Sequence, residues 1–421
     1  MQLGWIDFSK EDKDKALKVM WLLKESDVLD ELGFGVLRNA FANDFFPGIS
    51  TLHTRPKYLY LVYYMLLDFQ KKCRDQNGSK IPFDVNPSVF KEKMRKLIDS
   101  EEHSVKNCLI KNKCEEGVFG SSKKQESYWV DRTPLVVYWT GLRTYGFLKK
   151  KENLVSYNDV LVFFYEIAKD KDAKKNTWKK LRTDDEDEHN LGKSFSSPLN
   201  EFKYDSNWKK NAVIDLSNEE AKDLKNRIIN GEFSKNSLFA LLLKMNDLSD
   251  VFYKMDFATF VNVYKNQFPD EVKEKLVLAT QLNDFYNMVM VRYSFLLDKE
   301  RFKDNWEKMA KDALKICRQF NPQKIYSVMN IHRDPLEIFL NNLKKAIPVA
   351  IESGDYREVD RLIKERELKK KKEKNAKIGH PDRISSQDLK KYENMTNLRF
   401  NFRFDRAKQY IEDIKKGLNN A

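Results

Sequence analysis

Ten consecutive apolar residues, Tyr58 to Leu67, place the strongest constraint on how this chain of 421 residues can fold. Thr54 and Pro56 precede the run at positions that favour the start of a helix. A helix that is apolar on every side must be surrounded by other elements of its domain. A membrane-crossing helix needs about 20 apolar residues. We therefore expect a buried central helix and no membrane span.

The rest of the chain is poor in residues that interrupt helices, with only 14 glycines and 11 prolines. Ser217 and Glu220 form the S-x-x-E pattern of a capping box, which marks the start of a helix. Apolar residues recur at helical spacing over much of the sequence. The pattern predicts a mainly α, multi-helical protein, with further helices over 9–32, 36–44, 87–109, 133–145, 398–418 and, with short breaks, 217–368.

One segment combines a helix with strand-like residues. Thr133 and Pro134 begin a helix, and Gly146 follows its last turn at a position that favours glycine. Two short apolar segments, 147–148 and 154–155, flank a basic turn and predict a small β-hairpin. A helix followed by a hairpin is the ending of a winged helix-turn-helix unit. We expect such a unit to be embedded in the helical fold.

Changes in composition predict five consecutive regions. The stretch 169–211 is charged, poorly periodic and contains the acidic run 184–188, so we expect a linker there. The predicted regions are an N-terminal helical region (1–114), a winged-helix-like unit (115–168), the charged linker (169–211), a helical domain (212–368), and a basic loop with the C-terminal helix (369–421).

The formal net charge of +13 is concentrated in two segments. Residues 91–151 carry a net charge of +6, residues 357–421 carry +8, and all remaining residues together carry −1. A basic segment either contacts nucleic-acid phosphates or forms a solvated surface. Because the first segment overlaps the predicted helix and hairpin, we favour DNA binding there.

Five segments of the sequence resemble an uncharacterised prokaryotic family with a domain of unknown function. The segments are GWIDFS (4–9), LGFGVLRNAFANDFFPGIST (32–51), Thr54-Arg55 with Tyr58, YWTGLRTYGFL (138–148) and RAKQYIEDIKKGL (406–418). The resemblance covers nearly the whole chain. It implies a partner in DNA metabolism, because the genes of this family lie beside those of helicases and phospholipase D-type nucleases in mobile or antiviral defence loci. It implies no catalytic residues.

The winged-helix segment supplies the first candidate site. The helix face opposite the apolar side and the turn after the helix would place a recognition helix in a DNA groove and a basic wing along phosphates. The alternative is a winged helix that contacts protein or acts as a scaffold. The candidate nucleic-acid-binding residues are Arg132, Thr133, Thr140, Arg143, Lys149, Lys150 and Lys151.

The loop before the central helix supplies a possible anion site formed by Ser50, Thr51, Thr54 and Arg55. The first N–H groups of a helix and its dipole attract anions. In the alternative interpretation, Thr54 caps the helix and Arg55 pairs with a carboxylate.

Motifs of common catalytic sites are missing from the sequence. The segment 33–35 lacks the third glycine of a dinucleotide-binding loop, and none of the five histidines belongs to an H-x-K motif of phospholipase D-type nucleases. His103, Cys108 and Cys114 lack the spacing of a zinc site. We therefore expect no catalytic residue, metal or cofactor.

These observations predict a non-enzymatic DNA-binding or assembly subunit of a multiprotein DNA-metabolism or phage-defence system. Its expected partners are duplex DNA and proteins encoded nearby, such as a helicase or nuclease. The start of the chain lacks the pattern of a signal peptide, so we expect a cytoplasmic location. Two alternatives are a protein-interaction scaffold without nucleic-acid contact and a cryptic metal-dependent nuclease whose carboxylates assemble in space.

Overall fold

A computed structural model describes residues 30–75, 81, 85–114, 116–121, 130, 132–149, 156–180, 198–245, 248–395 and 399–419. The chain is mainly helical, as predicted, and these residues form no β-sheet. The helix predicted over 9–32 lies outside them apart from its end. The chain divides into two compact units, each built from separate segments. The α3 unit comprises residues 46–247 and 405–421, and the α11 unit comprises residues 1–45 and 248–404.

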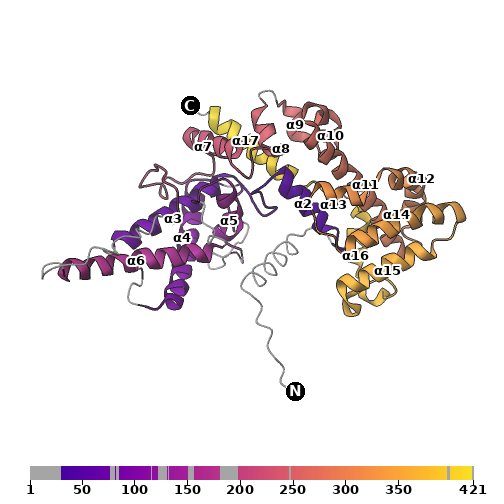
Figure 1. Cartoon of the computed structure of the whole chain (residues 1–421), viewed down its shortest axis with the longest axis horizontal. Coiled ribbons are helices and arrows are strands. Elements are labelled where there is room, and N and C mark those ends of the chain that lie inside the picture. Colours follow the sequence, from indigo (N-terminus) through magenta and orange to yellow (C-terminus); the bar gives the residue numbers. More distant parts are fainter. Residues whose placement is uncertain are drawn as a thin grey trace, which may run out of the picture. The chain divides into compact units, whose positions relative to one another are not determined.

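Helix α3 (Lys57–Asp75) is the central helix of the α3 unit (Figure 1). Every residue from Tyr58 to Leu66 is buried, which confirms the predicted buried helix. Helices α5 (Pro134–Thr144) and α6 (Tyr157–Lys180) pack against α3, and α4 (Pro87–Lys111) packs against α6 and α3. The apolar run is therefore covered by its neighbours.

The same unit contains α7 (Asn218–Asn230), α8 (Leu238–Lys244) and nearly all of α17 (Phe404–Asn419). Helix α7 begins with the predicted capping box. The Ser217 hydroxyl accepts a hydrogen bond from the Glu220 N–H, and the Glu220 carboxylate accepts one from the Ser217 N–H (2.8 Å). Both reciprocal bonds are present, so this local prediction is confirmed.

The end of α5 confirms the predicted position of Gly146, whereas the segment that follows pairs differently from the predicted hairpin. Gly146 has φ +68° and the Phe147 N–H donates to the Leu142 carbonyl (3.0 Å), as in a glycine-terminated helix. Beyond it, Leu148 forms an isolated antiparallel bridge with Leu199. Residues 150–155, which include the second predicted strand, lie outside the described part of the chain.

The predicted β-hairpin and winged helix are thus not found in the described residues. The backbone of 147–149 is bonded to 198–200: the Lys149 N–H donates to the Pro198 carbonyl (2.8 Å) and the Asn200 N–H to the Phe147 carbonyl (3.0 Å). In the described residues, the segment predicted as the first strand of the hairpin is thus paired with 198–200. Apolar spacing along the chain gives no sign of a partner about fifty residues away.

The stretch predicted as a charged linker contributes to the α3 unit. Helix α6 enters it as far as Lys180, and residues 181–197 lie outside the described residues. Farther on, the Tyr204 ring stacks on Tyr64 with centroids 5.0 Å apart, and the Trp208 indole N–H donates to Asp68 (2.8 Å). Aromatic side chains thus hold residues 198–211 on the central helix.

The α11 unit is organised by α11 (Asp270–Leu297), which contacts α12 (Lys303–Gln319), α16 (Ser386–Met395) and α10 (Phe257–Tyr264). Its other elements are α2 (Gly35–Phe45), α9 (Asp250–Lys254), η1 (Lys265–Gln267), α13 (Pro322–Val328), α14 (Pro335–Ser353), α15 (Arg357–Lys371), η2 (Glu373–Asn375) and η3 (Pro381–Arg383).

The basic stretch after Lys369 begins inside α15 and continues into a loop held by one buried side chain. The Glu367 carboxylate, fully buried, accepts hydrogen bonds from the N–H groups of Lys377 (3.0 Å) and Ile378 (3.1 Å). It also accepts one from the Tyr293 hydroxyl (2.6 Å). This carboxylate fixes the loop on the helix that precedes it.

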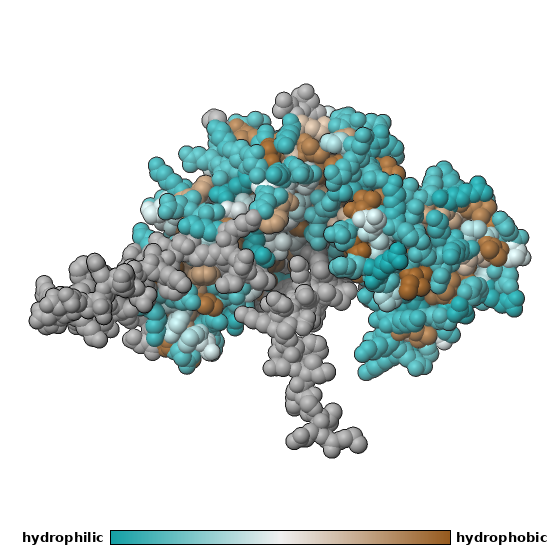
Figure 2. Space-filling model, in the orientation of Figure 1, coloured by the Kyte–Doolittle hydropathy of each residue, from teal (hydrophilic) through white to brown (hydrophobic). Residues whose placement is uncertain are grey.

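On the face drawn in Figure 2, hydrophilic residues cover most of the described surface, and hydrophobic residues are scattered among them. Among the helices that the structure describes, none is both long and apolar enough to cross a membrane.

Candidate nucleic-acid-binding cleft

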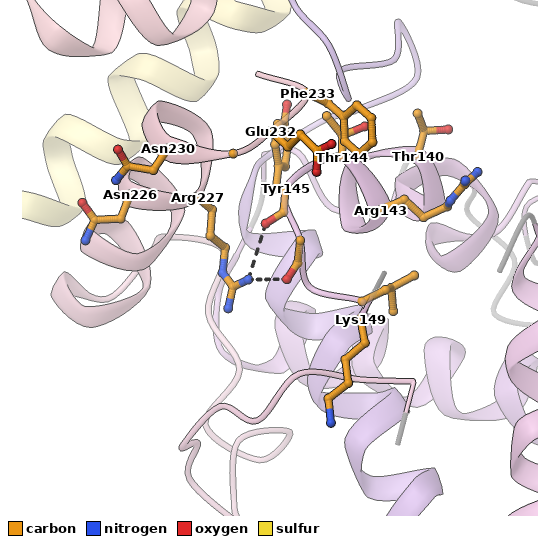
Figure 3. A pocket seen from close by; sticks show the side chains of 13 residues that line it. Thr140, Arg143, Thr144, Tyr145, Lys149, Asn226, Arg227, Asn230, Glu232 and Phe233 are labelled. Carbon is orange, nitrogen blue, oxygen red and sulfur yellow. Dashed lines mark hydrogen bonds between the residues drawn. The ribbon is translucent and has the colours of Figure 1, made fainter. Parts of the chain in front are cut away.

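A cleft of about 720 Å³ opens in the α3 unit between the end of α5 and the turn that follows α7 (Figure 3). Three residues predicted to contact DNA, Thr140, Arg143 and Lys149, line this cleft. The opposite side is formed by Asn226 and Asn230 of α7. The structure therefore brings part of the predicted site together with a second wall.

The burial of α5 decides which of its side chains reach the cleft. Seven of its eleven residues are buried, including Tyr138 and Leu142. Thr140 and Arg143 are exposed, and their spacing of three residues places them on one face of the helix. Because most of α5 is buried, only the narrow polar face that carries Thr140 and Arg143 reaches the cleft.

Arg227 ties the two walls of the cleft to each other. Its guanidinium pairs with Asp223 of the same helix (2.7 Å) and donates to the Gly146 carbonyl (2.7 Å) just beyond α5. The guanidinium carbon also lies 4.4 Å from the centre of the Phe147 ring. A cation in this position offsets the partial negative charge of the last carbonyl groups of α5.

A tight turn after α7 brings Phe233 to the cleft. A Cβ atom on Gly231 would lie 2.4 Å from the Arg227 carbonyl oxygen and 2.6 Å from Ser234 Oγ, so only glycine fits without a shift. The Ser234 hydroxyl donates to the Ile228 carbonyl (2.7 Å) and fixes the turn. The Phe233 side chain is 63% exposed.

The charged groups of the cleft are mainly positive. Arg143, Lys149 and Arg227 supply cations, and Glu232 supplies one carboxylate. In Figure 3, Arg143 and Lys149 lie on the α5 side, whereas Asn226 and Asn230 lie on the α7 side. The α5 side therefore suits phosphate oxygens, whereas the amides of Asn226 and Asn230 lie on the far side of the cleft and are turned away from Arg143 and Phe233 in Figure 3.

The other predicted nucleic-acid-binding residues do not line the cleft. Arg132 and Thr133 are half-buried at the opposite end of α5. Thr133 occupies the N-cap position, and the carboxylate of Glu102, from α4, accepts a hydrogen bond from the Leu135 N–H there (2.6 Å). Lys150 and Lys151 lie outside the described residues.

The possible anion site around Arg55 is built differently from the prediction. Arg55 Nε lies 2.6 Å from an oxygen of Asp413, and Nη2 lies 2.8 Å from an oxygen of Asp215. The structure thus shows the alternative interpretation for Arg55, pairing with carboxylates. Helix α3 begins at Lys57, two residues later than a Thr54 cap requires.

The rest of that loop is fastened to α5. The Tyr138 hydroxyl accepts hydrogen bonds from the N–H groups of Thr54 (2.8 Å) and Arg55 (3.1 Å). Ser50 is half-buried and its hydroxyl accepts from the Leu52 N–H (3.2 Å), while Thr51 is exposed. The four predicted residues are close together along the chain. Thr54 and Arg55 hold this loop against α5 through their hydrogen bonds to Tyr138.

Three residues that line the cleft were not predicted from the sequence: Asn226 and Asn230 of α7, and Phe233 of the turn that follows it. These residues lie more than seventy positions beyond Arg143, and no motif links the two segments. The sequence does contain one sign of an exposed aromatic residue. Phe233 follows Gly231 at the end of a helix with a predicted cap, and it does not belong to a regular apolar pattern.

Within the part of the chain that the structure describes, no three His, Cys, Asp or Glu side chains lie close enough together to hold a metal ion.

The fold and cleft define a helical protein with a largely basic, amide-lined cleft. The chain belongs to DUF6361, a family of unknown function, which matches residues 1–222. The match includes the α5 wall and ends within α7, before Asn226. No curated protein matches the chain, and neither does any solved structure.

Proposed function

We propose that this protein is a cytoplasmic, non-enzymatic DNA-binding subunit of a multiprotein DNA-metabolism or phage-defence system, and that the cleft of the α3 unit is its binding site. One observation carries the proposal: Thr140, Arg143 and Lys149, which the sequence pattern singles out, line one cleft together with Asn226 and Asn230. Three of the seven residues predicted to contact DNA thus lie on one concave surface.

Arg143 and Lys149 provide the phosphate contacts in this proposal. Arg143 is exposed in the last turn of α5, and Lys149 lies just beyond that helix. A guanidinium binds two oxygens of one phosphate, and an ammonium adds a positive point charge. Two cations on one wall favour an extended phosphate backbone along that wall.

Duplex DNA is the ligand that a winged helix would favour. A recognition helix must present a face to the major groove. Helix α5 buries seven of its eleven residues, and the proposed wing residues Lys150 and Lys151 are not described. The cleft supports DNA binding without a winged helix, and its ligand can be duplex or single-stranded DNA.

Charge reversal tests the proposal. We expect Arg143→Glu and Lys149→Glu each to weaken DNA binding by about tenfold or more and to lower the slope of log affinity against log salt by about 1. Fluorescence anisotropy of labelled oligonucleotides across a salt series measures both quantities. Lys93→Glu is the matched control, because Lys93 is exposed on α4 outside the cleft.

The proposal fails if the control and cleft variants bind alike, or if no DNA binds in a salt-dependent manner. Circular dichroism confirms that each variant is folded. A protein partner that co-purifies after nuclease digestion, without DNA binding by the pure chain, would instead support the scaffold alternative.

A further inference from the structure

We infer that the cleft binds single-stranded DNA, with one base stacked on Phe233 and the adjoining phosphates held by Arg143 and Lys149. The inference rests on the proposed function and names the form of its ligand. Three properties of the cleft lead to it: an exposed aromatic ring, two chemically different walls, and a concave shape.

Phe233 offers an unusually exposed aromatic surface. Its side chain is 63% exposed at the lining of the cleft, although burial of a phenyl ring is strongly favourable. The turn that carries it is fixed by Gly231 and by the hydrogen bond from Ser234 to the Ile228 carbonyl. A ring on a fixed backbone is a stacking platform that loses little entropy on binding.

The two walls match the two parts of a nucleotide. Arg143 and Lys149 suit phosphate, whereas Asn226 and Asn230 are exposed and four residues apart on one face of α7. The Glu232 carboxylate, beside Phe233 in Figure 3, can accept hydrogen bonds from a base edge, and the amides of Asn226 and Asn230 supply further donors and acceptors farther along the cleft. A free inorganic anion would use only the cations and would leave the amides and the ring without a role.

The shape of the cleft favours a single strand. Its volume of about 720 Å³ lies within the usual range for small-ligand sites. A duplex hides the faces of its bases in the stack, so a ring at the edge of a cleft cannot reach them. An unpaired strand can turn a base out of its backbone and insert it.

The experiment compares a labelled single strand with the duplex that it forms with its complement, at the same salt concentration. We expect wild-type protein to bind the single strand more tightly. Phe233→Ala should weaken single-strand binding by about 5- to 100-fold, and Phe233→Trp should retain it and show fluorescence quenching on binding. Ile110→Ala is the control, because it removes an exposed apolar side chain (47% exposed) outside the cleft.

An abasic strand of the same length separates stacking from phosphate contact. Wild-type protein should bind it more weakly than the normal strand, and Phe233→Ala should bind both equally. The inference is overturned if duplex binds as tightly as the single strand, or if Phe233→Ala binds as wild type does. In those cases the proposed function survives when Arg143→Glu still weakens binding; if neither form of DNA binds, both fail.

Discussion

The Nζ atom of Lys57 lies 2.7 Å and 2.6 Å from the two carboxylate oxygens of Glu220, and both side chains are buried. The same carboxylate completes the capping box with Ser217 and accepts a hydrogen bond from the Tyr64 hydroxyl (2.8 Å). The pair joins the first turn of α3 to the first turn of α7. The packing of the central helix therefore also positions the helix that carries Asn226 and Asn230.

Replacing Lys57 by Met should leave the Glu220 carboxylate buried without its cation. We expect Lys57→Met to lower the free energy of unfolding by about 3–5 kcal/mol, measured by urea denaturation. Lys96→Met is the control, because Lys96 pairs with Glu92 on the exposed surface of α4 (2.7 Å) and should cost less than about 1 kcal/mol. Equal effects of the two substitutions would contradict a stabilising role for the buried pair.

Glu102 is a buried carboxyl group at the start of α5. Oε1 accepts the Leu135 N–H (2.6 Å), and Oε2 is buried with no hydrogen-bond partner among the described residues. Burial raises the pKa of Glu102 to about 8, with a further increase from Asp99; the hydrogen bond from the Leu135 N–H and the nearby Thr133 side chain oppose the change. The folded protein thus favours the protonated group.

This raised pKa predicts a loss of stability with increasing pH. From about pH 4.5 to about pH 8 the folded state binds more protons at Glu102 than the unfolded state does, so stability falls as pH rises through that range. Between about pH 5 and 8.5, the free energy of unfolding of Glu102→Gln should fall by about 4 kcal/mol less than that of wild type, measured by urea denaturation. If the free energy of unfolding of the two proteins changed with pH in the same way, the prediction would be refuted.

The helices were predictable where a local pattern determines them. The run from Tyr58 to Leu67 needs burial on every side, Ser217 and Glu220 satisfy each other within one turn, and Gly146 allows the positive φ at the end of α5. These features depend on residues a few positions apart.

Features that depend on distant residues were not predictable. Leu148 bridges to Leu199, and the Leu135 N–H is bonded to Glu102 of another helix. The residues of the candidate site likewise divide into those that local sequence predicts and those that it does not. Arg143 and Lys149 were found from their local charge, whereas Asn226 and Phe233 reach the cleft only through packing.

Arg55 should respond to substitution as a structural ion pair and not as an anion site. A lysine cannot bind Asp413 and Asp215 in the forked geometry of the guanidinium, so Arg55→Lys should lower stability by about 1–3 kcal/mol. Urea denaturation with phosphate, against chloride at equal ionic strength, measures the loss. The loss should be the same in both salts; stabilisation of wild type alone by phosphate would support an anion site.

Gly231 should tolerate no side chain. The Cβ atom of Gly231→Ala would lie 2.4 Å from the Arg227 carbonyl oxygen, so the backbone of the turn must move. We expect a stability loss of about 1–3 kcal/mol. Single-strand affinity should fall as well, because the shift displaces Phe233. Lys235→Ala is the control, since it removes an exposed side chain from the same turn. Wild-type stability and affinity in Gly231→Ala would show that the turn is not under this constraint.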